Sequence, residues 1–152
     1  MSLLSSLHIL AVIVWVGGMF FAYMVLRPAA ASLLEPPQRL SLWRQVFNGF
    51  FPWVWASIIL ILVSGLWMMF AYFGGFAGAS AYIHTMLALG IIMMMLFMHV
   101  FFAPYKRLKK AVDAQNWPEG AKQLNMIRRI VGINTILGIV TSLVAVAGKG
   151  LL

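Results

Sequence analysis

The 152-residue sequence contains no cysteine and only three acidic residues. The absence of cysteine excludes disulfides, thiolate metal sites and a thiol nucleophile. The three acids, Glu35, Asp113 and Glu119, all fall outside the long apolar runs of the chain. We therefore expect no carboxylate within the membrane to act as a general base, a nucleophile, a magnesium ligand or the proton carrier of a transporter.

Charged residues are scarce, and apolar residues take their place. Only 9% of the residues are charged and 63% are hydrophobic, whereas about a quarter of the residues in a typical soluble protein are charged. This composition indicates an integral membrane protein whose main partner is the lipid bilayer. The net charge of +8 comes mainly from the segments that flank apolar runs, so it indicates membrane topology and no binding of nucleic acid.

Four apolar runs are each long enough to cross a hydrocarbon layer of ~30 Å. We expect one membrane domain, residues 1–152, with spans at about 3–26, 52–73, 80–102 and 127–147. The first span is expected to end at Arg27-Pro28, because proline continues a helix only at a cost, and Pro52 suits the first turn of the second. The predicted fold class is all-α, an up-down bundle of four transmembrane helices.

The basic residues predict the orientation of this bundle. Ten of the eleven lie in segments 27–51 and 104–129, which the positive-inside rule places in the cytoplasm. Both termini then face the periplasm, so we expect a multi-pass protein of a bacterial inner membrane. In the first basic segment Leu40, Trp43 and Phe47 recur at helical spacing, which predicts a short amphipathic interfacial helix before the second span. The oligomeric state stays open, a homo-oligomer included.

The second basic segment is expected to be helical in two parts. Residues 106–110, Lys-Arg-Leu-Lys-Lys, should continue the third helix beyond a kink at Pro104, where basic side chains meet anionic lipid head groups. Asn116-Trp117-Pro118-Glu119 then predicts a turn and the restart of a helix, because proline suits the first helical turn and glutamate suits the helix dipole.

Histidines within the spans are the main candidates for function, because ionisable groups at membrane depth are costly and commonly functional. His8 and His84 lie at the same depth, each about one turn inside the outer end of its span. Two imidazoles facing one another suit the axial ligands of a b-type haem. Trp15 is expected on the His8 face, and Gly17-Gly18 and Gly90 remove bulk where a macrocycle could lie. The alternative is a structural role, in which each histidine hydrogen-bonds a neighbouring helix.

His99 lies near the opposite membrane face, on the same predicted helix as His84. No second histidine exists at that depth, and Asn134 is the polar residue expected close enough to hydrogen-bond it. Four basic side chains are expected around the same rim: Arg27, Arg44, Arg128 and Arg129. They could hold porphyrin propionates, lipid phosphates or the water network of a quinone site, or they could serve topology and lipid contact alone.

Methionine is abundant, with eleven residues. The consecutive group Met93-Met94-Met95 points all round a helix and indicates packing and lipid contact. Met68, Met69 and Met86, in contrast, are expected near the outer surface beside the two outer histidines. Because thioethers suit Cu(I), this arrangement makes copper transport the alternative function.

Short motifs are spread over all four spans: Leu7-His8-Ile9, Val14-Trp15-Val16-Gly17-Gly18, Leu26-Arg27-Pro28, Ser64-Gly65-Leu66-Trp67, His84 with His99, and Arg128-Arg129 with Asn134-Thr135. In this order they resemble the CopD-like family of four-helix membrane proteins, a superfamily that also includes the HemJ-type protoporphyrinogen oxidases. The resemblance implies that His8 is a haem b ligand and that His84 and His99 correspond to the two histidines of the third HemJ helix.

The sequence departs from the HemJ pattern at three positions. Met86 stands where that pattern has a lysine, Met98 where it has a tyrosine, and Thr135 where it has a glutamate. The loss of the lysine and the glutamate removes the polar groups that would hold a substrate or move its protons. These departures argue against protoporphyrinogen oxidase activity and affect haem binding less.

The function favoured by the sequence is that of an inner-membrane b-type haem protein of this group, with His8 and His84 as axial ligands. Trp15, His99 and Asn134 would line the cofactor or a second polar site. The protein would carry out electron transfer or other redox chemistry with a quinone or another small redox partner, and whether it turns over as an enzyme stays open. The alternatives are the passage of Cu(I) through the bundle and a purely structural, helix-packing role.

Overall fold

The computed structural model describes the backbone of residues 2–151 and the side chains of residues 3–150. Within this range the chain is almost entirely helical and has no strand. Its elements are α1 (Ser2–Phe21), the π-helical turn η1 (Ala22–Leu26), α2 (Arg27–Leu33), α3 (Pro36–Tyr72), α4 (Gly75–Gly78), α5 (Ala81–Phe102), α6 (Pro104–Asp113) and α7 (Trp117–Leu151).

The prediction of an all-α membrane protein is confirmed. Four helical stretches of the described chain are long and apolar enough to cross a membrane: Leu3–Leu33, Pro36–Tyr72, Ala81–Asp113 and Trp117–Gly150. Each is longer than the span expected from the apolar runs, because the polar flanking segments are helical as well. Many large apolar side chains are exposed, Trp53, Trp67 and Val146 among them, as the lipid-facing surface of such a protein requires.

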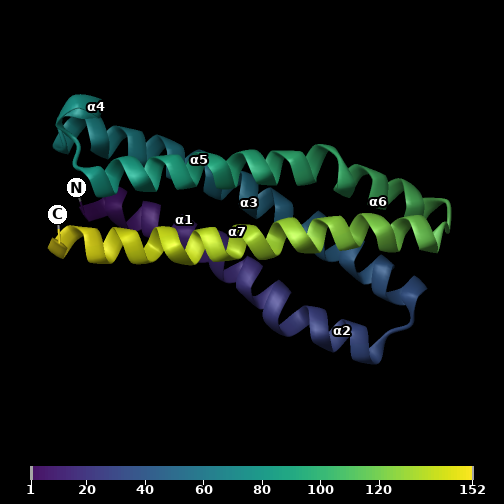
Figure 1. Ribbon diagram of the computed structural model, residues 1–152. Helices are drawn as coiled ribbons and strands as arrows, with labels where there is room; N and C mark the ends of the chain where they lie inside the picture. Colours follow the sequence, from purple (N-terminus) through teal and green to yellow (C-terminus); the bar gives the residue numbers. More distant parts are fainter. Residues whose placement is uncertain (1, 152) are drawn as a thin grey trace.

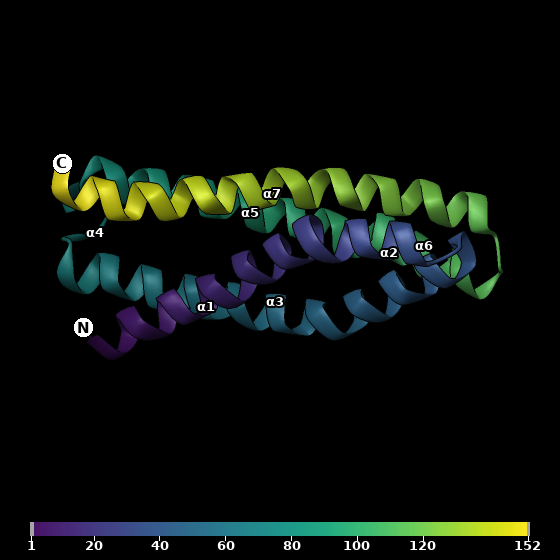
Figure 2. The ribbon, with the colours of Figure 1, turned by 90° about the horizontal axis from the view of Figure 1, so that it is seen from below.

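The long helices form two packed pairs (Figure 1, Figure 2). α1 packs against α3 and α5 packs against α7, while α7 also contacts α1 and α3 and so joins the pairs. Both termini and α4 lie at one end of the bundle, and α2 and α6 lie at the other (Figure 1). We call the first the outer end. The second carries almost all of the basic side chains, and we call it the basic end.

An aromatic cluster forms the core near the basic end. The ring of Phe51 stacks on Phe47 with 5.0 Å between centroids, and it meets Tyr105 and Phe97 edge-on at 4.8 and 5.2 Å. Each such pair stabilises the packing by about 0.5–1.5 kcal/mol beyond the burial of its area. The cluster therefore fixes α3 against the junction of α5 and α6.

The sequence predicts that the first helix ends at Arg27-Pro28, but the helix continues to Leu33. Proline lacks an N–H donor and its ring crowds the carbonyl four residues earlier, which normally breaks a helix. Here the wider π-helical turn accommodates it, with the backbone N–H of Arg27 bonded to the carbonyl of Ala22. The carbonyl of Tyr23 is then left to accept a hydrogen bond from Arg27 Nε at 3.2 Å.

The predicted interfacial helix is not a separate element. α3 runs unbroken from Pro36 to Tyr72 with Pro52 in its interior. The amphipathic stripe is present, since Leu40, Trp43 and Phe47 are all buried. In this part of the bundle α3 contacts α6 and α7. The stripe therefore packs against protein, and it lengthens the second membrane helix.

The second basic segment folds as predicted. α5 ends at Phe102 and α6 begins at Pro104 after a break at Ala103. α6 ends at Asp113, and α7 restarts three residues after Ala114. At this restart Asn116 Oδ1 accepts a hydrogen bond from the backbone N–H of Glu119 at 3.4 Å. An asparagine in this position satisfies one of the unpaired N–H groups of the first helical turn.

Candidate functional site

His8 is the histidine that the bundle holds in a defined position. It lies on the stripe of α1 that also carries Ala11 and Trp15, whose side chains are only 3% and 2% exposed. Its own ring is half-buried, and Nδ1 lies 2.9 Å from the Oγ of Ser64 in α3. Trp15 therefore shares the His8 face of α1, as the spacing predicts, and His8 belongs to the α1–α3 interface.

The hydrogen bonds of Ser64 favour one tautomer of the His8 ring. Ser64 is fully buried, and its hydroxyl donates to the carbonyl of Leu60 one turn earlier in α3. A serine hydroxyl has a single hydrogen, so when that hydrogen is used on the Leu60 carbonyl, Oγ accepts from His8 Nδ1–H. The lone pair of the neutral ring is then on Nε2. Metal-binding histidines are held in the same manner, with the second nitrogen donating to a fixed acceptor.

Gly65 supplies the space that the ring occupies. A Cβ atom at this position would lie 3.1 Å from Cε1 of His8 and 3.6 Å from its Nδ1. The pair Ser64-Gly65 thus provides both the acceptor and the room for the imidazole. The sequence alone does not reveal these roles. The one sequence signal for them is the motif Ser64-Gly65-Leu66-Trp67, a serine beside a glycine within an apolar run.

Two methionines follow on the same face of α3. Met68 lies one turn beyond Ser64, and Met69 lies one turn beyond Gly65, so their side chains project from the face that contacts His8. Helical side chains lean toward the N-terminus, which brings both thioethers back toward the level of the imidazole. Met68 is half-buried and Met69 is 3% exposed. An imidazole nitrogen and thioether sulfurs are ligands that suit Cu(I).

His84 has different surroundings. It lies in the first turn of α5 with its side chain exposed. Since α1 packs on α3 and α5 packs on α7, the two expected ligands belong to different helix pairs. No hydrogen bond or ring contact among the described residues joins them. The pairing of His8 and His84 as haem or metal ligands therefore stays a prediction.

The expected hydrogen bond between His99 and Asn134 is replaced by another. His99 is exposed near the end of α5, whereas Asn134 is buried in α7. Asn134 Nδ2 donates instead to the backbone carbonyl of Met93 at 3.1 Å, and its Oδ1 is buried without a hydrogen-bond partner. Asn134 thus ties α7 to α5. The roles predicted for both residues in cofactor binding stay predictions.

The glycines expected to leave room for a macrocycle differ among themselves. A Cβ atom at Gly18 would lie 2.3 Å from the ring of Phe50, so this position is filled by a packed aromatic side chain. Gly17 and Gly90 have no such neighbour within 4 Å. Close helix packing accounts for Gly18, while the other two face open space.

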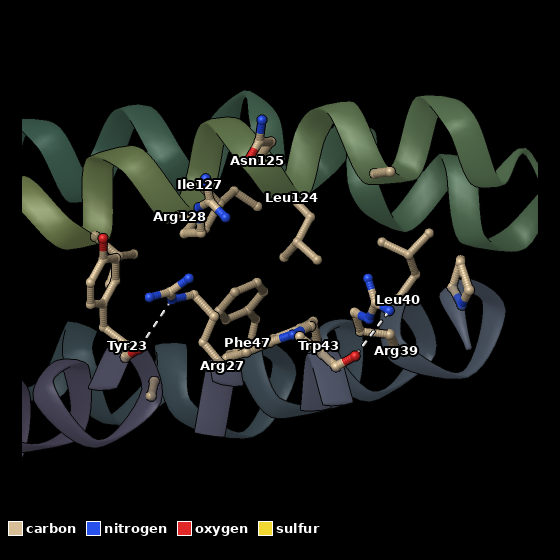
Figure 3. A pocket seen from close by; sticks show the side chains of 15 residues that line it. Tyr23, Arg27, Arg39, Leu40, Trp43, Phe47, Leu124, Asn125, Ile127 and Arg128 are labelled. Carbon is tan, nitrogen blue, oxygen red and sulfur yellow. Dashed lines mark hydrogen bonds between the residues drawn. The ribbon is translucent and has the colours of Figure 1, made fainter. Parts of the chain in front are cut away.

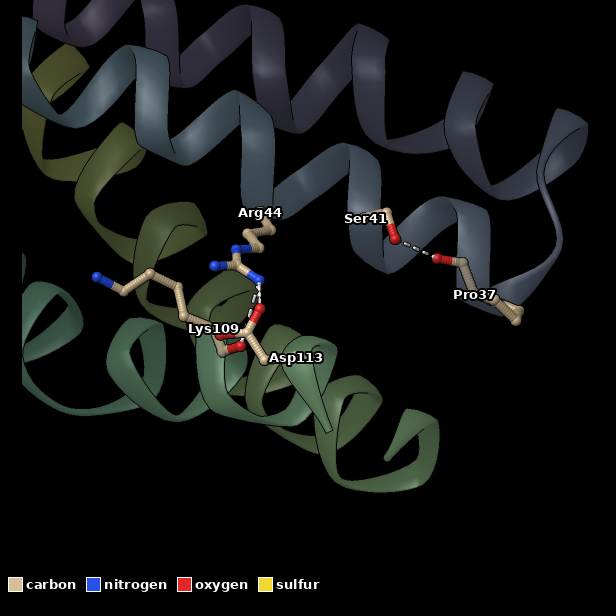
Figure 4. Close-up of polar contacts among 5 residues, drawn as sticks. All are labelled: Pro37, Ser41, Arg44, Lys109 and Asp113. Carbon is tan, nitrogen blue, oxygen red and sulfur yellow. Dashed lines mark hydrogen bonds and ion pairs between the residues drawn. The ribbon is translucent and has the colours of Figure 1, made fainter. Parts of the chain in front are cut away.

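The arginines expected at the inner rim separate into three groups. Arg27 and Arg128 line a cavity of about 360 Å³ together with Arg39 (Figure 3). Arg44 forms an ion pair with Asp113 and also donates to the carbonyl of Lys109 at 3.5 Å, which joins α3 to α6 (Figure 4). Arg129 is exposed on α7.

The described part of the chain holds no cluster of the residues that most often bind metal ions. No three histidine, aspartate or glutamate side chains come together there as a potential metal site. The remaining candidate is the His8 imidazole, with Met68 and Met69 one turn farther along the neighbouring helix α3. This donor set suits a soft monovalent ion, and it does not suit Mg²⁺ or Ca²⁺, which require oxygen ligands.

Comparison with known proteins identifies the family. The model of the family described as Copper resistance protein D, CopD, matches residues 44–147, which is more than half of the chain. The match includes Ser64 and Gly65 and begins beyond His8. Neither a curated protein nor a solved structure matches the chain. With its four membrane-spanning helices, the protein is a multi-pass protein of the inner membrane, and it belongs to the CopD family.

Proposed function

We propose that the protein binds Cu(I) within the membrane, as part of copper resistance, with His8 Nε2 as the nitrogen ligand. The observation that carries this proposal is the hydrogen bond between His8 and Ser64. This contact supports the tautomer with the lone pair on Nε2, at a depth where a polar group needs a reason to be present. Met68 and Met69 would supply thioether sulfur from the adjoining face of α3.

Such a site needs no carboxylate. A neutral imidazole and neutral thioethers bind Cu(I) without adding negative charge to a low-dielectric region, which agrees with the lack of acidic residues in the apolar runs. His84 is exposed at the outer end of the bundle, so we propose that it takes up or releases copper at the surface. The positive-inside rule favours a cytoplasmic position for the basic end, and the outer end with both termini then faces the periplasm.

Haem b is the second candidate, favoured by the same fixed imidazole. Nε2 of His8 could bind haem iron, with His84 or a thioether as the opposite ligand, since both His/His and His/Met pairs are used in b- and c-type cytochromes. In this case the protein would exchange electrons with a quinone or another small redox partner. Copper is preferred because it is the function associated with the family.

The metal content and the absorption spectrum of the purified protein distinguish these candidates. After expression with both copper and a haem precursor in the medium, we expect stoichiometric copper and no Soret band, in the oxidised and the dithionite-reduced state. A Soret band without copper would replace the copper proposal by haem. A preparation that binds neither would leave the histidines with a structural role.

Replacing Ser64 with alanine is expected to weaken Cu(I) binding by about 10- to 100-fold, the usual effect of removing the partner of a metal-binding histidine. The affinity can be measured anaerobically by competition with a chromogenic Cu(I) chelator. Ser57→Ala is the matched control, because Ser57 is also buried in α3 but lies two turns before Ser64, the hydrogen-bond partner of His8. Unchanged affinity in Ser64→Ala would show that the hydrogen bond does not prepare His8 for metal.

A further inference from the structure

The cavity at the basic end combines an apolar wall with positive charge. It is lined by residues of η1, α2 and α3 and, across from these, by residues of α7 (Figure 3). The apolar wall includes Trp43, Phe47, Leu124 and Ile127, and the basic side chains are Arg27, Arg39 and Arg128. A ligand for this cavity must therefore have both a negatively charged part and an apolar part.

No acidic residue lines the cavity. Of the three acids in the chain, Asp113 pairs with Arg44, and Glu119 accepts a hydrogen bond from Gln123 at 2.8 Å. Glu35 forms no ion pair within the described chain. Three like charges line this largely apolar cavity, so they repel one another. An anion bound between them would remove this repulsion.

Two of the arginines are held in place by backbone carbonyls and still have donors to spare. Arg27 uses Nε for the Tyr23 carbonyl, and its guanidinium lies 4.6 Å from the centroid of the Tyr23 ring. Arg39 Nη2 donates to the carbonyl of Leu34 at 3.0 Å, and its Nε is buried without a partner. In Figure 3 the guanidinium of Arg27 points toward the α7 wall, where Arg128 lies. The terminal nitrogens of Arg27 thus face the cavity.

We propose that this cavity binds an anionic phospholipid, with its phosphate on the arginines and an acyl chain along the aromatic wall. Arginine pairs with phosphate through two parallel hydrogen bonds, and Arg27 and Arg128 lie across the cavity from one another, with Arg39 toward its other end (Figure 3). The apolar wall favours a ligand with a tail over a soluble phosphate. A bound lipid would connect α2 with α7 on the side where the two helix pairs meet.

The expected position of the cavity across the membrane agrees with the binding of a lipid head group. From Leu3 to Arg27 the helix rises by ~36 Å at 1.5 Å per residue, which exceeds the ~30 Å of the hydrocarbon layer. Arg27 therefore lies in the head-group zone, as do the many lysines and arginines of α6 and early α7. Such basic segments attract anionic lipids to the surface around them. The site is independent of copper binding at the outer end.

The test compares lipids on the full-length protein in a neutral detergent. Phosphatidylglycerol is expected to raise the melting temperature, whereas phosphatidylcholine and inorganic phosphate are not. Arg128→Gln should weaken phosphatidylglycerol binding, measured by native mass spectrometry, by about tenfold, because one charged hydrogen-bond pair is lost. Arg129→Gln is the matched control. It makes the same change of charge at the next residue of α7 but lies outside the cavity lining, so it should bind as the wild type does.

Ala121→Trp provides a second variant that leaves every arginine in place. Ala121 is an exposed residue of α7 that lines the cavity, so tryptophan would fill it and displace the lipid without altering charge. The proposal is overturned if both cavity variants bind phosphatidylglycerol normally, or if Arg129→Gln loses as much affinity as Arg128→Gln. Stabilisation by phosphatidylcholine or by inorganic phosphate alone would also overturn it, in favour of a general lipid effect or a soluble anion.

Discussion

Replacing His8 with alanine is expected to abolish high-affinity Cu(I) binding, with a loss greater than the ~100-fold limit expected for its hydrogen-bond partner. His8 is the one histidine whose orientation the described contacts fix, through Ser64. Without it, the outer layer of α1 and α3 keeps only thioether donors. The loss can be measured by anaerobic competition with a chromogenic Cu(I) chelator and by copper analysis of the purified protein. Cells that express the variant should also lose any copper tolerance that the wild-type protein provides.

His99→Ala is the matched control for this variant. It removes the same group from an exposed position near the other end of α5 and should leave the affinity unchanged. Equal losses in both variants would indicate a general effect on folding. If His8→Ala retains stoichiometric copper while His84→Ala loses it, the site is centred on α5 and the assignment made from the Ser64 contact is wrong.

Replacing Gly138 with leucine is expected to lower the free energy of unfolding by about 3 kcal/mol, at the upper end of the usual cost of overpacking. Gly138 lies in α7 where that helix meets both α1 and α5. A Cβ atom there would lie 2.7 Å from Cγ2 and 3.1 Å from Cγ1 of Val16, and 3.2 Å from Cε of Met93. Val16 cannot rotate easily about χ1, so a larger side chain at position 138 would be accommodated only if α1 moved away from α7. Unfolding by sodium dodecyl sulfate in mixed micelles measures the loss.

Gly90→Leu controls for the substitution itself. Gly90 lies within α5, and a Cβ atom there would meet nothing within 4 Å. Leucine at this position should leave stability unchanged or raise it, because glycine in a helix interior costs about 1 kcal/mol relative to a good helix former. Similar losses in the two variants would show that Gly138 is not a close-packing position. Small residues at such positions are what allow membrane helices to approach one another.

The apolar runs were sufficient to predict four spans and the all-α fold, since the bilayer requires long apolar helices. The break at Pro104 and the restart after Asn116 also followed from local backbone chemistry. The helix end predicted at Pro28 was wrong, because the cost of a proline depends on whether the helix can widen, and the sequence does not show this. The separate interfacial helix was wrong as well. An amphipathic period identifies an apolar stripe without telling whether lipid or protein covers it.

For the candidate site, the sequence predicted only how far along its helix each residue lies. Counting residues placed His8 and His84 in one layer, but depth does not tell which helices are neighbours around the bundle. Because α1 packs on α3, the contact of His8 is Ser64. Asn134 illustrates the same limit. Its expected depth predicted a hydrogen bond to His99, but in the packing of α5 on α7 it donates to the Met93 carbonyl. That His8 and His84 share a layer stays a prediction, and the partners of each side chain could be identified only from the packing of the helices.

The π-helical turn η1 has a geometric consequence for the first span. Each residue of an α-helix advances the chain by about 100° around its axis, and a π-turn amounts to one additional residue within an otherwise α-helical path. Without that residue, everything from Arg27 onward would be rotated by about 100°, and Ala30, now 3% exposed, would leave the protein interior. The first span therefore consists of two segments of different angular phase. The half that carries His8 faces α3, and a single inserted residue sets the direction in which the half that carries Arg27 faces.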